Sequence, residues 1–444
     1  MKKYIFTLLL VYGSFTSVTA QTADARIPKI DSLLSYFNAN NKFMGSVAIQ
    51  KEDKVILKQA YGYASVEGNI KANTQTKYKI GSVTKMFTSA VIFQLIEEGK
   101  LSLDTKLSKY FPEIKNADAI TIKNMLNHTS GIFNFTNDES FGLYMKNKET
   151  QKAMAGRIAA FDAAFQPGTK AEYSNSNYLL LGYIIEKITG KPYKDMVEKR
   201  IVKKLGLKNT TYFSAIEPQQ NEAYSYTFNG DNWIREEEWN ESVAGAAGAL
   251  QSTPEDLTAF VYALFEGKII SQKSLDEMLI MDFGYGKGIF IFPFGERQFY
   301  GHTGGIEEFT SVLSYYPDEK VALAFLINGS NYNYNEIIIG ILRLYYNMPY
   351  SFPNFKTIQV APEILKSYEG IYASEEFPLK ITVKHHKEDN QLIAQATGQG
   401  PIPLNSVSET EFTCDPAGIN ITFNTANSFT LHQNGAVIEF IKEK

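Results

Sequence analysis

The stretch YKIGSVTKMFTSAVIFQLIEEGK, residues 78–100, decides how the chain folds. Residues 83–96 are helix-forming and apolar on nearly every side, and Gly99 provides a stop signal after them. A helix that is apolar all round is buried. Ser82 and Lys85 stand at the mouth of this segment, and their i, i+3 spacing puts both side chains on one helix face, about 5 to 6 Å apart at Cβ. The sequence therefore predicts a central buried helix that begins with a serine beside a lysine.

These two side chains suit nucleophilic catalysis. A serine hydroxyl is a weak nucleophile at neutral pH unless a neighbouring base takes its proton. Burial lowers the pKa of a lysine, because removal of water disfavours the ammonium form, and the neutral amine can then be that base. In the first turn of a helix, Ser82 also lies among free backbone N–H groups that favour an oxyanion. The structural alternative is that Ser82 caps the helix and Lys85 is solvated, although the chain holds no other S-x-x-K.

Two later segments carry residues that suit the same chemistry. In the polar loop AEYSNSNYLL, residues 171–180, the phenol of Tyr173 suits proton transfer and the amide of Asn175 suits a substrate amide. The stretch YGHTGGIEEF, residues 300–309, ends a predicted strand, where glycines let a substrate approach the backbone. Taken singly, Tyr173 is one of 27 tyrosines and fits a packing role, and a histidine beside glycines fits a structural one.

Taken together, the three segments resemble one known family. SVTK at 82–85, YSN at 173–175 and HTG at 302–304 match, in order, the three motifs of the serine β-lactamase and penicillin-binding protein superfamily. Their form is most similar to the branch that contains class C β-lactamases, DD-peptidases and related esterases and D-amino-acid peptidases. The segments MLNHTSGI, AGALQSTPEDL and GYGKGIF extend the resemblance, which covers roughly residues 27–347.

The resemblance implies a role for each motif residue. Ser82 would form an acyl-enzyme, and Lys85 and Tyr173 would share the proton transfers, with the choice of base between these two left open. The backbone N–H groups of Ser82 and Gly305 would form the oxyanion hole. The substrate-binding residues implied by the resemblance are Asn175, His302, Thr303, Gly304 and Gly305, of which His302 and Thr303 would contact a substrate carboxylate.

One residue departs from the β-lactamase pattern. Those enzymes usually carry a lysine where this chain has His302. A histidine, with an ordinary pKa of about 6.5, is only partly charged at neutral pH. A permanent positive charge for the carboxylate of a β-lactam is therefore missing, which ranks antibiotic hydrolysis below peptide or ester hydrolysis.

The order of the predicted elements indicates an α+β fold. Residues 45–65 read as a β-hairpin, residues 82–267 as mostly helical, and residues 288–329 as short strands rich in β-branched and aromatic side chains. Strands at both ends with helices between them predict an antiparallel sheet flanked by helices, with an inserted helical lobe. Residues 351–361 are predicted to be a linker, and residues 362–444 a small all-β domain.

The N-terminus and the composition limit location and partners. Residues 1–20 combine a basic start, a short apolar run and small residues, which predicts a cleaved signal peptide and an exported (periplasmic or secreted) protein. The hydrolase domain is then predicted at residues 21–350, between the signal peptide and the linker. The one cysteine, Cys414, excludes intramolecular disulfides. A net charge of −4 with mixed signs gives no basic stripe for nucleic acid, and no later run is long enough to span a membrane. We expect a small-molecule or peptide substrate, with peptidoglycan-derived peptides among the candidates.

The leading functional prediction is an exported serine hydrolase that acts through an acyl-serine on amide or ester bonds, of the DD-carboxypeptidase or D-amino-acid peptidase type. The alternatives are a class C-like β-lactamase or an esterase, and a non-catalytic penicillin-binding or sensing module. The chain has no G-x-S-x-G, and its five histidines form no H-E-x-x-H, so no metal or cofactor is expected. Substrate choice is expected to depend on residues 136–152 and 229–241, and His128 is expected to have a structural role at a helix end.

Overall fold

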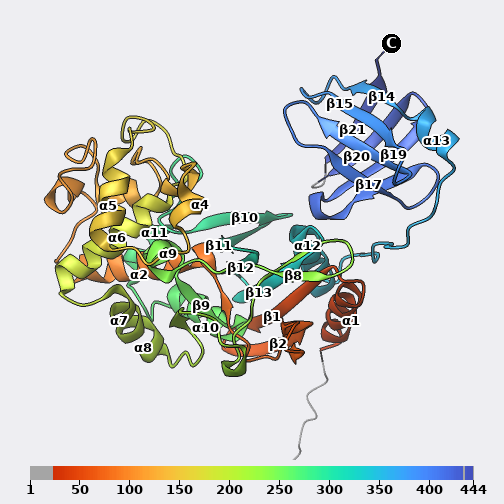
Figure 1. The fold of residues 1–444 in the computed structure, drawn as a ribbon. Coiled ribbons are helices and arrows are strands. Elements are labelled where there is room, and N and C mark those ends of the chain that lie inside the picture. The colour runs from red at the N-terminus through yellow and green to blue at the C-terminus, as the bar shows by residue number, and fades with distance from the viewer. Residues whose placement is uncertain (1–23, 434–435, 444) are drawn as a thin grey trace, which may run out of the picture.

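The computed structural model describes residues 24–433 and 436–443. Within them the chain forms an α+β body and a closed antiparallel barrel, which a segment without helix or strand connects (Figure 1). The predicted fold class is confirmed: an antiparallel sheet flanked by helices with a helical lobe, followed by an all-β domain. The predicted signal peptide at residues 1–20 lies outside the described residues, and the predicted domain limits stay a prediction.

An 8-stranded sheet forms the centre of the body, and its main path runs β10-β11-β12-β13-β1-β2. Strand β1 pairs antiparallel with β13, with Val47 opposite Phe325, so the N-terminal hairpin completes a sheet made of late strands. The short strands β7 (Tyr226–Phe228) and β8 (Trp233–Arg235) are joined to the end of β13. The bounds of the main strands are β1 Phe43–Lys51, β2 Lys54–Tyr61, β10 Phe290–Phe294, β11 Arg297–Ile306, β12 Phe309–Tyr316 and β13 Val321–Ser330.

Helices cover both faces of this sheet. On one face, α1 (Arg26–Ala39) and α12 (Tyr334–Tyr345) pack together over an apolar cluster that includes Val47 and Phe325. On the other face, α10 (Pro254–Phe265) packs against β1 and β13, where small buried residues such as Ala324 leave room for it. The first and last helices of the body therefore lie side by side although they come from opposite ends of it.

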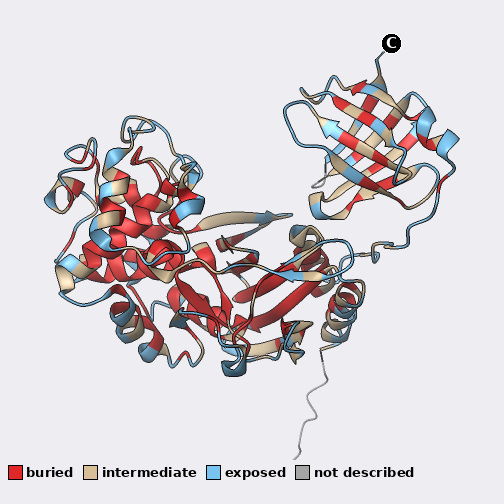
Figure 2. Ribbon diagram, in the orientation of Figure 1, coloured by how far each residue is buried: buried red, intermediate tan, exposed pale blue. Residues whose placement is uncertain are grey.

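The helical lobe surrounds α2 (Thr84–Glu97), in which residues 84–95 are all buried (Figure 2). The α-helix begins at Thr84, whereas Ser82 lies in the 3₁₀ turn Gly81–Val83 that leads into it. The chain enters this tight turn through Gly81, whose φ of 46° favours glycine. The other helices of the lobe are α3 Ile122–Leu126, α4 Phe141–Tyr144, α5 Gln151–Ala160, α6 Asn175–Thr189, α7 Tyr193–Val197, α8 Lys203–Leu205, α9 Glu241–Gly248 and α11 Gln272–Leu279.

The C-terminal domain is a closed barrel in which each strand pairs with the next and β14 pairs with β21. Aromatic side chains such as Tyr372, Phe423 and Phe429 fill its interior. The short helix α13 (Pro362–Ser367) precedes the barrel. The bounds of its strands are β14 Gly370–Ala373, β15 Ile381–His386, β16 Gln391–Ala396, β17 Ile402–Ser406, β18 Glu411–Cys414, β19 Ile419–Thr425, β20 Ser428–Gln433 and β21 Ala436–Lys442.

A few polar contacts join the barrel to the body. Lys42 Nζ lies 2.7 Å from Asp415 Oδ2, and the backbone N–H of Asn333 donates to Asp415 O over 2.9 Å. The barrel lies on the opposite side of the body from the helical lobe (Figure 1). None of the helices within the described residues is long and apolar enough to span a bilayer.

Candidate active site

Ser82 and Lys85 meet at the N-terminal end of the buried helix α2. Lys85 Nζ lies 2.9 Å from Ser82 Oγ, 2.8 Å from Asn175 Oδ1 and 2.7 Å from Ala247 O. The Lys85 residue is 0% exposed. Burial lowers the pKa of Lys85 well below its ordinary value, because the charged form loses its hydration. A dehydrated amine is therefore in direct contact with the serine hydroxyl.

The three contacts of this amine suit both of its protonation states, because the ammonium form can donate one N–H bond to each oxygen. Asn175 Oδ1 and Ala247 O can only accept hydrogen bonds. A neutral amine has two N–H bonds and one lone pair, so these two oxygens take both N–H bonds and the lone pair faces Ser82 Oγ. In the ammonium form Lys85 Nζ donates to Ser82 Oγ. In the neutral form, which burial favours, the serine O–H can donate to the nitrogen of Lys85, and this is the arrangement that a general base needs.

Tyr173 contacts the same serine from another direction. Its O–H donates to Ser82 Oγ over 2.7 Å. Burial raises the pKa of Tyr173 above its ordinary value, so the phenol keeps its proton at neutral pH. Ser82 Oγ therefore accepts a hydrogen bond from Tyr173 while its own proton points at Lys85.

His128 holds the ring of Tyr173 in place. The two ring centroids are 4.4 Å apart, and Nδ1 of His128 accepts the backbone N–H of Ser174 over 3.1 Å. Burial lowers the pKa of His128 well below its ordinary value, so the imidazole is neutral and Nδ1 is free to accept. The sequence predicts only a structural role at a helix end for this residue, because no local pattern reveals that folding brings position 128 against Tyr173.

The amide of Asn175 is engaged on both sides. Its Oδ1 faces Lys85, its Nδ2 donates to Thr136 Oγ1 over 3.1 Å, and its backbone N–H donates to Asn134 Oδ1 over 2.9 Å. Asn175 is also the first residue of α6, so its place follows from the start of that helix. A substrate amide that reached Asn175 would meet it beside Thr136.

Two glycines let strand β11 lie directly against the serine. A Cβ on Gly304 would come within 2.1 Å of Ile80 O and 2.9 Å of Ser82 N, and a Cβ on Gly81 would come within 2.9 Å of Gly305 N. A larger residue at position 304 is therefore excluded unless the backbone moves. The backbones of Ser82 and Gly305 lie side by side, the arrangement in which two N–H groups can point at one oxyanion.

His302 belongs to the same strand and is only 2% exposed. Its Nδ1 donates to Thr303 O, and its ring packs edge-on against Phe290 at 4.7 Å between centroids. Burial, reinforced by the charge of Lys85, lowers the pKa of His302 to about 3. The imidazole is therefore neutral at physiological pH, and a contact of His302 and Thr303 with a substrate carboxylate stays a prediction.

A cavity of about 230 Å³ opens onto Ser82. Of the predicted residues, Ser82, Asn175 and Gly305 line it; Lys85 and Tyr173 contact Ser82 from the protein interior, and His302, Thr303 and Gly304 are set back from it. Sequence reasoning did not single out the residues of the opposite wall, although Thr136 and Trp239 fall within the two segments expected to influence substrate choice. The remaining lining residues are Gly81, Phe135, Thr136, Trp239, Ala244, Ala247, Gly248 and Ile306.

The beta-lactamase family profile matches residues 31–342. The chain belongs to the beta-lactamase family. Teichoic acid D-alanine hydrolase of Staphylococcus aureus (strain MRSA252) is 28% identical over 71% of this chain and 78% of its own. The structure of D-amino acid amidase from Ochrobactrum anthropi SV3 has 28% identity and a TM-score of 0.65, and covers 72% of this chain and 98% of the amidase. The octameric penicillin-binding protein homologue from Pyrococcus abyssi has 26% identity and a TM-score of 0.67, and covers 94% of this chain and 99% of its own.

This beta-lactamase-family protein is a serine hydrolase, as its relatives are. The family profile covers the body, and the likeness to the Pyrococcus structure continues into the barrel region. Across residues 24–433 and 436–443, no group of three or more His, Cys, Asp or Glu side chains is arranged to hold a metal ion. The site consists of a hydroxyl, an amine, a phenol and backbone amides, which together can perform acyl transfer.

Proposed function

We propose that this beta-lactamase-family protein is an exported hydrolase that cleaves amide or ester bonds of D-amino-acid derivatives through an acyl-Ser82 intermediate. The observation that carries the proposal is the double contact on Ser82 Oγ, from a dehydrated amine at 2.9 Å and from a protonated phenol at 2.7 Å. The names of two relatives support the substrate class, since one is a D-alanine hydrolase of teichoic acid and the other an amidase of D-amino acids. The signal-peptide pattern of residues 1–20 supports export.

Acylation begins with attack of Ser82 Oγ on the carbonyl carbon of the substrate. Lys85 takes the serine proton, and the backbone N–H groups of Ser82 and Gly305 stabilise the negative charge that forms on the carbonyl oxygen. The phenol of Tyr173 donates to the serine oxygen in the resting state and is placed to pass a proton to the leaving nitrogen or oxygen. Collapse of the tetrahedral intermediate releases the protonated amine or alcohol and leaves the acyl group on Ser82. The proton that Lys85 took from Ser82 then replaces the one that Tyr173 gave to the leaving group, so the acyl-enzyme again holds a neutral amine and a protonated phenol.

Deacylation returns the enzyme to its resting state. A water molecule that enters from the cavity attacks the ester carbonyl, and Lys85 with Tyr173 takes its proton. The proton is then returned to Ser82 Oγ as the ester bond breaks. The acid is released, and the amine of Lys85 is again neutral.

The surroundings of the serine favour substrates that carry no carboxylate beside the scissile bond. The lining of the cavity is made of neutral side chains, with apolar surface from Phe135, Trp239 and Ile306. His302 is neutral, so it provides no fixed charge for a carboxylate. We therefore rank amides, esters and peptides of D-amino acids above a carboxypeptidase reaction that depends on a free terminal carboxylate, and above β-lactam hydrolysis.

A substrate panel tests this proposal. We expect turnover of D-alanine amide and D-phenylalanine amide, little turnover of the L-isomers, and acylation by benzylpenicillin that intact-protein mass spectrometry detects as a long-lived adduct. Faster hydrolysis of a peptide ending in D-Ala-D-Ala would favour a DD-carboxypeptidase. Fast nitrocefin turnover without amide hydrolysis would make the protein a β-lactamase. No reaction and no adduct with any of these compounds would favour a binding or sensing module.

The pH dependence of the reaction follows from the two perturbed groups. Lys85 must be neutral to take a proton, so the rate rises as pH increases through its lowered pKa and falls on acidification. The raised pKa of Tyr173 keeps the phenol protonated on the alkaline side. We expect kcat/KM for a D-amino-acid ester to fall about tenfold per pH unit below the pKa of Lys85 and to stay level up to about pH 10. A bell-shaped profile with an alkaline limb near neutral pH would contradict this assignment.

A further inference from the structure

A buried ion pair lies next to the cavity. Lys79 Nζ is 2.6 Å from Glu307 Oε1, and each side chain is only 1% exposed. Burial raises the pKa of Glu307, and the adjacent ammonium of Lys79 opposes that rise. Withdrawal of two charges from water costs more than an ion pair usually returns in stability, so stability alone does not explain why such a pair is buried here.

The two partners of this pair belong to the segments that carry the oxyanion groups. Lys79 is the last residue of β5 (Tyr78–Lys79) and lies three residues before Ser82. Glu307 directly follows β11 and lies two residues after Gly305. The ion pair therefore connects the segment that leads into the turn with Ser82 to the end of the strand that bears Gly305.

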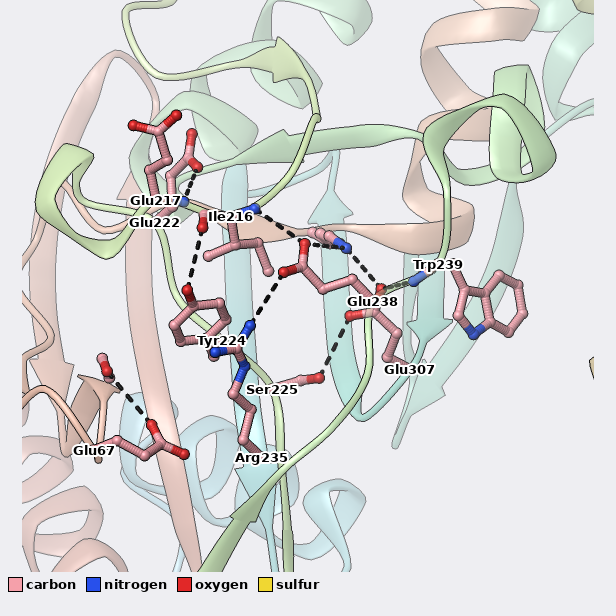
Figure 3. A network of polar contacts seen from close by, with 12 residues as sticks. Glu67, Ile216, Glu217, Glu222, Tyr224, Ser225, Arg235, Glu238, Trp239 and Glu307 are labelled. Atoms are coloured by element: carbon pink, nitrogen blue, oxygen red, sulfur yellow. Dashed lines mark hydrogen bonds and ion pairs between the residues drawn. The ribbon is translucent and has the colours of Figure 1, made fainter. Parts of the chain in front are cut away.

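The same carboxylate also holds the wall of the cavity. Glu307 Oε1 accepts the backbone N–H of Trp239 over 2.7 Å, and Trp239 lines the cavity (Figure 3). Glu238 adds a second attachment, because its Oε2 lies 3.5 Å from Lys79 Nζ and accepts the backbone N–H of Ile216 over 3.0 Å. The ring of Trp239 packs edge-on against Phe141, 4.8 Å between centroids. The buried carboxylate of Glu307 thus fixes the backbone at Trp239.

The backbone of Glu307 indicates that its side chain is needed. Glu307 has a φ of 53°, in the left-handed region where glycine or asparagine is less strained. The chain keeps a glutamate in this turn, and the contacts with Lys79 and Trp239 compensate for the strain.

We propose that the Lys79–Glu307 ion pair is a positioning element of the active site. It fixes the backbone N–H groups of Ser82 and Gly305 relative to each other, and it holds Trp239 in the cavity wall, where Trp239 selects the acyl side chain of the substrate. Neither residue touches the reacting atoms; both act through Ser82, Gly305 and Trp239. The proposal rests on the function proposed above, because it concerns the same site.

The test replaces the pair by two side chains of similar volume without charge, Lys79→Met/Glu307→Met. Exchange of both partners removes both charges of the pair together, and Glu238, which also contacts Lys79, keeps Arg235 at 3.5 Å, so the variant is expected to fold. The chain's two tryptophans are Trp233 and Trp239, and a Trp233→Phe background makes the emission report Trp239 alone. The matched control, Lys42→Met/Asp415→Asn, removes a partly buried ion pair of 2.7 Å that lies at the junction with the barrel.

Three measurements decide the outcome. We expect the rate of acylation by a fluorophosphonate to fall roughly tenfold to a hundredfold, because small displacements of oxyanion groups lower reaction rates by about this factor. We expect the ratio of kcat/KM for D-phenylalanine amide over D-alanine amide to change by about fivefold or more, because the wall moves. Acrylamide quenching of Trp239 should increase. The control variant should leave all three values unchanged.

A folded double variant with wild-type values in all three measurements would overturn the proposal. If circular dichroism shows that the double variant does not fold, the variant Lys79→Arg replaces it in the test, because arginine keeps the charge but alters the geometry of the pair. An unchanged ratio of kcat/KM for the two amides in this variant would then overturn the proposal. If the wild-type protein hydrolyses neither amide, the proposed function fails, whereas the fluorophosphonate rate and the quenching still decide the positioning role.

Discussion

Replacement of Ser82 by alanine is expected to abolish covalent labelling and to lower kcat/KM by on the order of 10⁴-fold or more. The hydroxyl that both Lys85 and Tyr173 contact is then missing, so no acyl group can be held. The mass of the intact protein after incubation with a fluorophosphonate, and separately with benzylpenicillin, measures this directly. The wild-type protein should gain one adduct, and Ser82→Ala none.

Ser89→Ala provides the matched control for this experiment. Ser89 is a buried serine on the same helix, and its Oγ lies 3.2 Å from the hydroxyl of Tyr178. The control variant should be labelled like the wild type, because its hydroxyl contacts neither the base nor the phenol of the site. Labelling of Ser82→Ala at the wild-type rate would place the nucleophile elsewhere and refute the assignment.

Replacement of Lys85 by methionine is expected to lower the acylation rate by about 10² to 10⁴, the usual contribution of a general base. Methionine keeps most of the side-chain volume, so the helix stays packed and the loss reports the missing amine. The acid limb of the pH profile, which belongs to Lys85, should disappear in the residual activity. Stopped-flow acylation by a chromogenic D-amino-acid ester from about pH 5 to about pH 9 measures both effects.

The variant Tyr173→Phe tests which of Lys85 and Tyr173 is the base. In the mechanism proposed above Lys85 is the base for acylation and Tyr173 a donor, so the phenylalanine variant should lose less acylation rate than the methionine variant and keep the acid limb. The opposite order, with Tyr173→Phe more damaged and Lys85→Met retaining the limb, would make the phenol the base.

The fold class and the contact between Ser82 and Lys85 could be predicted because their signals are local, whereas the role of Ser82 as nucleophile stays a prediction. Residues 83–96 are apolar on nearly every side, and burial is the favourable environment for such a helix. The spacing of Ser82 and Lys85 in the sequence is that of one helical turn, and in the structure Lys85 Nζ lies 2.9 Å from Ser82 Oγ. The residue at which the helix starts could not be predicted from the sequence, because the 3₁₀ turn at Ser82 depends on the φ of Gly81 and on the neighbouring strand β11.

The parts of the site that sequence reasoning missed come from contacts between distant segments. His128 supports Tyr173, and Glu307 holds Trp239, although neither pair is close in sequence. The neutrality of His302 is also a property of the fold, because burial, and after it the nearby Lys85, lowers the pKa of its imidazole. Residue type and spacing contain no information about such contacts until the sheet is assembled.

The pairing of β1 with β13 has a consequence for how the protein matures. Val47 cannot find Phe325 until nearly the whole body has been synthesised, and α1 cannot pack on α12 before then. Contacts between such distant residues form slowly, since closure of a long loop must precede them. We expect the nascent chain to remain open while it leaves the ribosome, the state that the proposed export through a translocation channel requires.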